Sequence, residues 1–473
     1  MPADDSLSRA LDYADRWLDY RRWRLRIPGV QAAVRVGGAL VLDTAHGVAD
    51  ASTGEALTPH HRFRVASHSK SLAALAAMRL VDEGRLRLDD SAAQHVPALR
   101  DTDAGALLVR ELLSHGSGAT RDSDDVSFWR LESAFPDADR LLAIARAGVS
   151  RLPASAEFKY SNIGFGLLGL VIEQITGEPY DVALEQLVLA PLGLRSSSGD
   201  LRPEAGSTSA AGAGDPTARV AGPLVTGHSA LHSSEERTAL GNPPTGALAA
   251  ATGAVAPARE LTDALRAVTD ADDRLLAATT RRRMRQRQWS TSRPGIDAGY
   301  GLGLMLRTID GREWAGHGGA WTGQATRTLV DAERDVVISV CTNAIDAPAE
   351  ELAIGVAGIV RAALDAGERG SAAMRTAADL ARARSFEGTY ASIWGRVDVV
   401  ELGGRLLCIA PTAPDPLQLV DELEPLDDDR VRITASTGMG AGHETATAER
   451  DASGRVVRWR GAMHMERVSA RVG

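Results

Sequence analysis

Strand-like segments lie at both ends of the first 366 residues, and a long, mostly helical stretch separates them. Two come early, at residues 29–36 and 39–45, and three come late, at residues 313–317, 325–330 and 335–341. Short apolar or alternating runs joined by tight turns favour antiparallel pairing. We therefore expect one antiparallel sheet built from both ends of this segment, with the helical middle as a second lobe and a cleft between the lobes.

Helical patterns complete this first part of the chain. Residues 5–20 carry apolar side chains at helical spacing, and residues 348–366 do so after the last strand, so both are expected to flank the sheet. The helices of the middle are predicted near residues 67–83, 138–148, 163–176 and 257–268. Residues 203–256 are rich in Gly, Ala, Ser and Pro and are predicted to form long loops that line the cleft, together with residues 119–137.

From residue 386 onward the pattern changes to seven short alternating strands separated by turns such as Gly403-Gly404. Such spacing predicts a small all-β domain, a closed barrel. Residues 367–384 are predicted to form a linker helix. The predicted fold class is therefore α+β over residues 1–368, followed by an all-β barrel domain over residues 375–473.

Charge and composition limit the partners. The net charge is −9, which makes nucleic acid and anionic membranes poor partners. The N-terminus carries acids where a signal peptide has Lys or Arg, and no run of about 18 apolar residues occurs. A cytoplasmic location is expected, with no membrane contact. The two cysteines, Cys341 and Cys408, are too few for a disulfide framework. The oligomeric state stays open, a homodimer included.

Only two of the 53 basic side chains are lysines, Lys70 and Lys159. A guanidinium stays charged in proteins, so a position that must lose its proton cannot be Arg. Drift in a GC-rich coding sequence explains the scarcity, but not where the two remaining lysines lie. Ser67 precedes Lys70 by three residues at the start of an apolar helix, so the hydroxyl and the amine share one face. Desolvation there lowers the pKa of the lysine toward that of a general base. The alternative is a capping serine beside a solvated lysine.

Two further segments carry chemistry. Tyr160 and Asn162 lie two apart in an extended segment and point to the same side. A phenol beside an ammonium is stabilised as phenolate and can relay a proton, whereas the amide can hold a substrate amide or orient the lysine. The alternative is a buried tyrosine beside an N-capping asparagine. Lys159 faces away and is expected to be solvated.

The glycine-rich residues 316–323 form the second of these segments. Glycines on a strand let a substrate backbone approach closely, and the Ala320 N–H can polarise a carbonyl. His317 is a candidate to contact the substrate or to tune Lys70. The alternative is a glycine-rich bulge with an incidental histidine.

The three segments, in this order, resemble the boxes of the serine β-lactamase and DD-peptidase superfamily. The closest likeness is to the branch of class C β-lactamases, D-aminopeptidases and esterases, and it covers about residues 1–366. The S-x-x-K, Y-x-N and H-x-G boxes of that branch correspond here to Ser67–Lys70, Tyr160–Asn162 and His317–Gly319. The terminal barrel resembles the lipocalin-like domains appended to some of these hydrolases, which can cover the cleft.

This resemblance implies chemistry through an acyl-enzyme on Ser67, on a small-molecule or short-peptide substrate, without metal or cofactor. The implied catalytic residues are Ser67, Lys70 and Tyr160, the implied oxyanion hole is the N–H groups of Ser67 and Ala320, and the implied substrate contacts are Asn162, His317 and Gly319. Typical β-lactamases and carboxypeptidases of the superfamily have Lys where this chain has His317. A mostly neutral imidazole holds a free carboxylate less tightly. We therefore expect amides, D-amino-acid-type peptides or esters as substrates, with β-lactams, or a non-catalytic sensor that is acylated once, as alternatives.

Other motifs compete weakly. Residues 164–169 match the dinucleotide fingerprint G-x-G-x-x-G, but a short polar segment precedes them instead of a buried strand. Residues 227–231 (Gly-His-Ser-Ala-Leu) lack the second glycine of a nucleophile elbow. The arginine run at residues 281–287 is predicted to be a solvated helix face. The histidines lack a coherent metal-ligand spacing.

Overall fold

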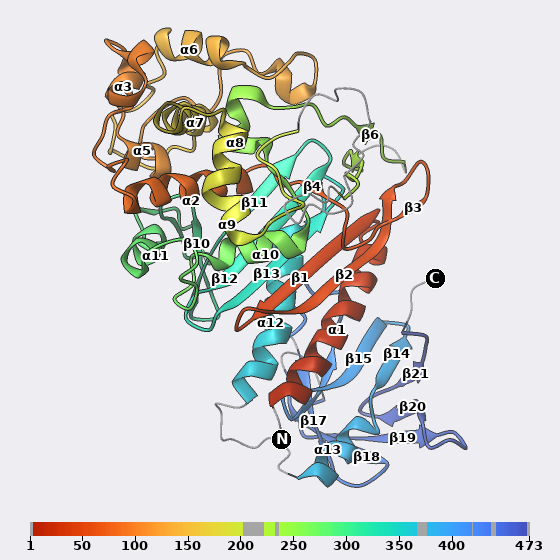
Figure 1. Cartoon of the computed structure of the whole chain (residues 1–473). Helices are drawn as coiled ribbons and strands as arrows, with labels where there is room; N and C mark the ends of the chain where they lie inside the picture. The colour runs from red at the N-terminus through yellow and green to blue at the C-terminus, as the bar shows by residue number, and fades with distance from the viewer. Residues whose placement is uncertain are drawn as a thin grey trace, which may run out of the picture. The chain divides into compact units, whose positions relative to one another are not determined.

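The computed structural model describes residues 3–201, 222–231, 236–366, 376–418, 420–436 and 441–470. Its main sheet has nine antiparallel strands in the order β3-β2-β1-β13-β12-β11-β10-β9-β8 (Figure 1). Strand β1 (Gly29–Val36) pairs with β13 (Val336–Thr342), more than 300 residues away in the sequence, with Val34 opposite Ile338. The prediction of one antiparallel sheet assembled from both ends of the segment is confirmed.

The other strands of this sheet extend from both sides of the central pair. They are β2 (Ala39–Asp50), β3 (Glu55–Ala56), β8 (Trp289–Ser290), β9 (Ala298–Tyr300), β10 (Met305–Ile309), β11 (Arg312–Trp321) and β12 (Gln324–Asp331). Two short ribbons lie apart from it: β4 (Phe63–Arg64) with β7 (Val255–Ala256), and β5 (Gly227–His228) with β6 (Ala239–Leu240).

The middle of the chain forms the helical lobe. Its helices are α2 (His68–Asp82), α3 (Ala92–His95), α4 (Asp103–Ala106), α5 (Val109–Ser114), α6 (Ala138–Arg146), α7 (Asn162–Thr176), α8 (Tyr180–Leu184), α9 (Ala190–Leu192), α10 (Ala258–Arg266) and α11 (Ala278–Arg285). Short 3-10 or π turns are η1 (Pro97–Leu99), η2 (Ser127–Arg130), η3 (Glu185–Leu189), η4 (Gly246–Leu248) and η5 (Ala249–Gly253). Among the helices described, none combines the length and apolar character needed to cross a membrane.

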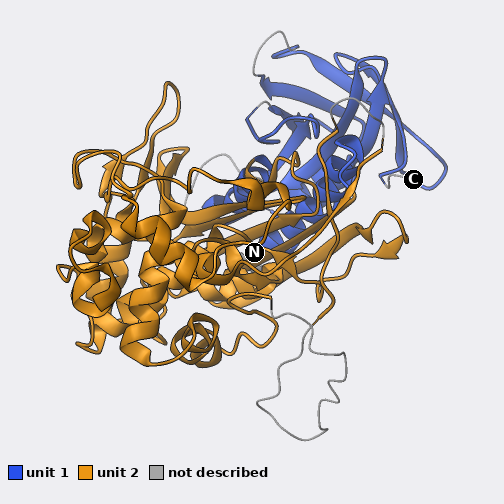
Figure 2. Cartoon of the chain, turned by 90° about the horizontal axis from the view of Figure 1, so that it is seen from above, with its two compact units in different colours: residues 1–27, 351–473 blue, residues 28–350 orange. Residues whose placement is uncertain are grey.

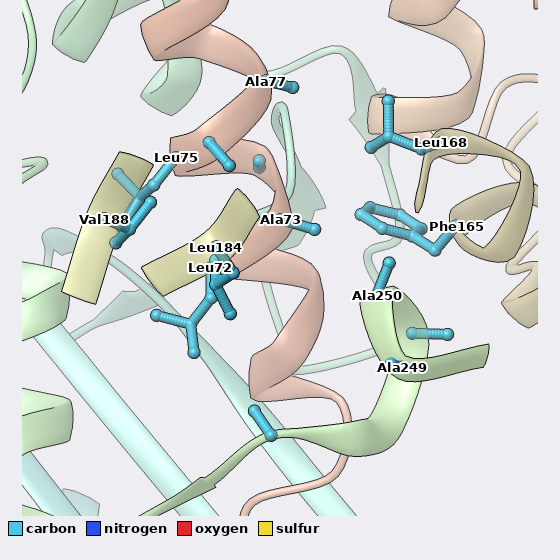
Figure 3. Close-up of a cluster of buried hydrophobic side chains, with 14 of the residues drawn as sticks. Leu72, Ala73, Leu75, Ala77, Phe165, Leu168, Leu184, Val188, Ala249 and Ala250 are labelled. Atoms are coloured by element: carbon cyan, nitrogen blue, oxygen red, sulfur yellow. The ribbon is translucent and has the colours of Figure 1, made fainter. Parts of the chain in front are cut away.

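Helix α2 is the structural centre of this lobe. Of its 15 residues, 12 are buried, so it is apolar on nearly all sides, as expected of a helix inside a core. Figure 3 shows its side chains between Phe165 and Leu168 of α7, Leu184 of α8 with Val188, and Ala249 and Ala250 of η5. Because α2 is held from several directions, the residues at its N-terminus have a fixed position.

The loop prediction for residues 203–256 holds only in part. Residues 202–221 and 232–235 lie outside the described residues. The described remainder contains short strands and the turns η4 and η5, and η5 is buried against α2 and α7 because its alanines are small. Its residues belong to the core beneath the site, not to a cleft-lining loop.

Contacts divide the chain into two compact units, which Figure 2 colours separately: residues 28–350, and residues 1–27 together with 351–473. The second unit contains α1 (Ala3–Arg24), α12 (Ala349–Ala366) from residue 351 on, α13 (Ala377–Arg384) and the barrel. Within it, the Trp17 indole N–H donates to the carbonyl of Pro411 at 3.1 Å. The second unit therefore combines residues from both sides of the boundary that was expected near residues 368–375. The predicted linear domains 1–368 and 375–473 stay a prediction. Of the predicted linker helix, residues 376–384 are described, and 377–384 are helical.

The C-terminal strands close into an eight-stranded antiparallel barrel, which confirms the predicted all-β domain. Its core contains Phe386 stacked on Trp459, with ring centroids 5.6 Å apart. The eighth strand, β21, was not predicted, because it has only three residues. The barrel strands are β14 (Gly388–Ser392), β15 (Gly395–Leu402), β16 (Arg405–Ile409), β17 (Val420–Pro425), β18 (Arg430–Ala435), β19 (Thr445–Arg450), β20 (Val456–Gly461) and β21 (Met465–Arg467).

Candidate active site

Three of the predicted residues meet at one hydroxyl. The Nζ of Lys70 lies 3.2 Å from the Oγ of Ser67, and the Tyr160 hydroxyl donates to the same Oγ at 2.7 Å. Ser67 stands immediately before α2, and its side chain makes no capping bond to the helix. The alternative of a capping serine beside a solvated lysine therefore does not describe this site, because Lys70 is fully buried.

The backbone before the serine adopts an unusual conformation. Ala66 has a φ of +45°, a left-handed conformation that costs a residue with a Cβ about 1–3 kcal/mol. Its carbonyl accepts from the Ser69 N–H at 2.9 Å and from the Ser69 hydroxyl at 2.6 Å, which holds the turn in place. This turn presents Ser67, which is half-buried, at the start of α2.

Lys70 has an acceptor for each of its three protons. Besides Ser67, its Nζ donates to Asn162 Oδ1 at 2.8 Å and to the carbonyl of Ala251 at 2.7 Å. Complete burial lowers the pKa of Lys70 well below its usual value, and the nearby Asp122 carboxylate opposes part of this shift. A neutral amine, able to take a proton from Ser67, is thereby available at a lower pH than for an exposed lysine.

Tyr160 differs from the sequence interpretation in its protonation. Burial raises the pKa of the phenol, and this outweighs the bond to Ser67, which lowers it. Burial therefore favours the protonated phenol over the predicted phenolate. The protonated hydroxyl acts as a donor.

His115 fixes the segment that carries Tyr160, a role that the sequence motifs did not predict. It lies at the end of α5 with a φ of +59°, and its ring packs against that of Tyr160, with centroids 4.2 Å apart and planes tilted by 37°. Its Nδ1 accepts from the Ser161 N–H at 3.1 Å, and its carbonyl accepts from the Lys159 N–H at 2.8 Å. The sequence signal was the segment 111–118, which contains His115 and resembles the corresponding segment of the serine β-lactamase and DD-peptidase superfamily, but it indicated no role for the histidine.

A cleft of about 510 Å³ opens at Ser67. The predicted residues that line it are Ser67, Tyr160, Asn162, Gly319 and Ala320; Arg121, Asp122 and Trp129 come from the segment 119–137 that was expected there. The position of Gly319 admits no other residue without rearrangement, since a Cβ would overlap the carbonyl oxygen of Val65. The Asn162 amide is engaged at both ends, by Lys70 and by Asp122, whose Oδ1 accepts from it at 2.9 Å.

His317 does not line this cleft. Its ring is fully buried, its Nδ1 contacts the carbonyl of Gly318 at 2.7 Å, and its Nε2 contacts the Tyr300 hydroxyl at 3.1 Å. Its ring lies beside the rings of His68 and Tyr300 and outside the cleft lining, which argues against a direct substrate contact, while its predicted influence on Lys70 stays a prediction. Burial lowers the pKa of His317 well below its usual value, with smaller effects of His68 and Lys70 in the same direction, so it is neutral.

A fixed cation lies in the cleft where the sequence predicted none. Arg327 on β12, opposite Gly318, lines the cleft and is only 6% exposed. One Nη lies 3.3 Å from the Met305 sulfur, the other is 3.7 Å from the half-exposed Glu350 carboxylate, and its Nε has no hydrogen-bond partner among the described residues. Nothing in the local sequence distinguishes it from the other arginines.

The competing motifs have structural explanations. Residues 164–169 lie inside α7 and do not form a dinucleotide-binding loop. A Cβ at Gly166 would come within 2.9 Å of Leu248, so this glycine allows α7 to approach its neighbour closely. In the arginine run, Arg282 and Arg283 are exposed as predicted, but Arg281 is buried and donates to the Leu276 carbonyl at 2.7 Å. Among the residues described, no cluster of His, Cys, Asp or Glu side chains is suited to a metal ion.

A buried helix that presents Ser-x-x-Lys beside an antiparallel sheet defines the class of penicillin-recognising serine enzymes. The comparison of sequences agrees: residues 14–359 match the family described as Beta-lactamase. The chain therefore belongs to the Beta-lactamase family.

Relatives cover this chain to different extents. The crystal structure of SurE is 27% identical, covers 97% of this chain and 99% of its own, and has a TM-score of 0.60. That of a D-stereospecific amidohydrolase from Streptomyces sp. is 26% identical, covers 76% of this chain and 100% of its own, with a TM-score of 0.59. Esterase EstB of Burkholderia gladioli is 32% identical over 36% of this chain and 46% of its own length. Other curated relatives are matched over about a third of their length, 35%.

Proposed function

We propose that this chain is a serine hydrolase that forms an acyl-enzyme on Ser67 and acts on amides or peptides of D-amino-acid type, or on esters. The observation that carries the proposal is the convergence of a desolvated amine and a protonated phenol on one half-buried hydroxyl. An activated nucleophile needs a base within hydrogen-bond reach, and the departing group needs an acid.

In acylation, neutral Lys70 takes the proton of Ser67 as its Oγ bonds to the acyl carbon. The resulting oxyanion lies at the N–H groups of Ser67, at the N-terminus of α2, and of Ala320 on β11. The bond to the leaving nitrogen or oxygen then breaks as Tyr160 donates its proton to that atom. The Lys70 ammonium returns a proton to the phenolate, so both groups are restored.

Deacylation repeats these steps with water in place of the departed group. Water attacks the ester carbon, its proton passes to the Lys70 and Tyr160 pair, and Ser67 leaves with the proton that Lys70 returns. Asn162 keeps the amine of Lys70 in place throughout, because the carboxylate of Asp122 holds the other end of its amide.

The substrate class is supported by relatives of this chain. SurE was crystallised with D-Leu, and the Streptomyces relative is described as D-stereospecific. EstB is described as an esterase, which supports esters as a second class. The neutral, buried His317 offers no ammonium for the carboxylate of a β-lactam, but Arg327 places a guanidinium in the same cleft, so β-lactams stay an alternative.

A panel of chromogenic substrates tests the proposal. Initial rates are measured on D- and L-alanine p-nitroanilide, a p-nitrophenyl ester and a chromogenic cephalosporin, with the Ser67→Ala variant as control. We expect turnover of the D-anilide or the ester that Ser67→Ala abolishes. A cephalosporin as the fastest substrate would refute the assigned class. A single stoichiometric acylation without turnover would favour the sensor.

A further inference from the structure

A second cavity of about 350 Å³ adjoins the cleft. The two share four lining residues: Tyr160, Met305, Arg327 and Glu350. Ser67 and Ala320 line only the cleft, whereas Tyr160 lines both. The phenol that would protonate the leaving group therefore lies where the two cavities meet.

The floor of the second cavity is one face of the strand pair β9 and β10. Ala298 pairs with Arg307, and Tyr300 pairs with Met305, so these four side chains share a face of the sheet. Gly299 and Leu306, which pair with each other between these two positions, complete the lining contributed by the two strands.

Aromatic side chains form the wall nearest to Tyr160. The rings of Phe158 and Tyr300 lie 5.5 Å apart, and both line the cavity with Tyr160. Ile296 stands at the rim with 38% of its surface exposed. Together with the thioether of Met305, these groups make one wall that suits an apolar side chain, while Arg293, Arg307, Arg327 and Glu350 give the rest of the lining its charge.

The direction of the reaction assigns this cavity to one part of the substrate. The acyl carbon must lie against Ser67 with its oxygen toward Ala320, and both residues belong to the cleft. The leaving nitrogen must lie against the Tyr160 hydroxyl, 2.7 Å from Ser67 Oγ, from where the second cavity continues. We propose that this cavity is a leaving-group subsite that takes an amine with a large apolar group, an inference that rests on the proposed amide hydrolysis.

Size separates two substrate classes. A primary amide releases ammonia, which is about the size of a water molecule, whose share of liquid volume is about 30 Å³. The cavity is larger by roughly a factor of ten. Peptides and anilides with an apolar leaving group are therefore the preferred substrates, and primary amides leave the subsite unfilled.

The test uses one substitution that fills the cavity and one matched control. Ala298→Phe places a ring in the subsite, and Ala298 does not line the cleft that contains Ser67. Ser290→Phe adds the same ring at an exposed position on the adjacent strand β8, which lines neither cavity. Three substrates share one acyl residue: D-phenylalanine amide, D-phenylalanine p-nitroanilide and D-phenylalanyl-L-leucine amide.

Wild-type protein is expected to prefer D-phenylalanyl-L-leucine amide over the primary amide by about ten- to a hundredfold in kcat/KM, the size expected for burial of one apolar side chain. The p-nitroanilide, whose leaving group is intrinsically more reactive, is compared only between variants. Ala298→Phe removes this preference and leaves the primary amide within about twofold, whereas Ser290→Phe changes nothing. Equal rates for the dipeptide amide and the primary amide in the wild type, or an equal loss on all three substrates in Ala298→Phe, would overturn the subsite.

A binding measurement keeps this result separate from failure of the proposed hydrolysis. In the Ser67→Ala background, calorimetry compares binding of the dipeptide amide with that of the primary amide, with and without Ala298→Phe. Tighter binding of the dipeptide that Ala298→Phe removes supports the subsite even if no substrate turns over. Binding unaffected by Ala298→Phe overturns it even if hydrolysis is confirmed.

Discussion

The two walls of the cleft differ in how completely their charged groups are satisfied. On the α2 wall, the buried amine of Lys70 has an acceptor for each proton and is surrounded by core on nearly all sides. On the wall made by β11 and β12, the buried guanidinium of Arg327 has, within the described part of the chain, only a sulfur and a distant carboxylate as partners. A buried donor without a partner costs about 1–3 kcal/mol. The amine of Lys70 therefore has its hydrogen bonds without substrate, whereas the guanidinium of Arg327 would gain a partner when a ligand with an acceptor binds.

This difference separates reaction from recognition. Changes on the α2 wall should stop turnover of every substrate, because they alter the groups that move protons. Changes on the β11 and β12 wall should depend on which substrate is used. The predictions below test one side of this division or, for His68, the connection between the two walls.

The largest effect is expected for Lys70→Arg. A guanidinium cannot give up its proton and therefore cannot take one from Ser67. We expect kcat/KM to fall by about a thousandfold for every substrate, within the range for loss of a general base. Initial rates with an anilide and an ester measure this.

The matched control is Lys159→Arg, the same change at the only other lysine of the sequence. Lys159 is half-buried and does not line the cleft. It should keep its rate within about twofold, and thermal melting of both variants shows whether they fold. Substantial activity in folded Lys70→Arg would remove Lys70 from the role of base.

The residues of the α2 wall could be predicted from the sequence, whereas those of the β11 and β12 wall mostly could not. Ser67, Lys70, Tyr160 and Asn162 were recognisable because a helix turn or an extended tripeptide fixes their mutual geometry over a few residues. The sheet could also be predicted, because its strands carry an apolar pattern at both ends of the segment. Such features depend on short stretches of chain.

What depends on tertiary arrangement could not be predicted. Whether His317 faces the cleft or the core depends on which face of β11 is inward, and the glycines around it carry no alternation that shows this. Arg327 is one of 51 arginines, and only the pairing of β11 with β12 brings it opposite Gly318. The buried turn η5 was hidden in a composition that is typical of loops.

The next effect concerns His68, which joins the two walls. It belongs to α2, and its Nε2 lies 2.8 Å from the Thr328 hydroxyl on β12. Burial, with a contribution from Arg327, lowers the pKa of His68 to about 3. The unfolded chain binds a proton at His68 below about pH 6.5 and the folded chain does not, so stability falls as pH falls through this window.

His68→Gln should reduce this acid sensitivity, because glutamine does not titrate. The free energy of unfolding should fall less steeply in the variant, by about 1.4 kcal/mol per pH unit between roughly pH 6 and pH 4. Urea unfolding at both pH values provides the comparison. Parallel slopes in the two proteins would show that His68 is protonated in the folded state.

A smaller, substrate-dependent effect is expected for Arg327→Gln. We expect Arg327 to bind an acceptor on the substrate. For a substrate whose leaving amino acid has a free carboxylate, kcat/KM of the variant should therefore fall about tenfold, since a hydrogen bond to a charged group is worth about 1.5–3 kcal/mol. The same substrate with an amidated end should change little. Arg282→Gln, at an exposed position of α11, is the control. Equal losses on both substrates would show that Arg327 supports the sheet and not the ligand.

The smallest effect is expected for Asp122→Asn, and it appears in the pH profile. Asparagine can still accept from the Asn162 amide and from the Trp129 indole, which now donate to Asp122 Oδ1 at 2.9 and 3.0 Å, so the plateau rate should stay within about threefold. The lost carboxylate no longer favours the ammonium form, so the pKa of Lys70 falls further. Since the neutral amine is the active form, the acid limb of kcat/KM should move to lower pH, by about one unit. An acid limb that does not move would mean that a group other than Lys70 controls it. The general base would then not be the satisfied amine of the α2 wall.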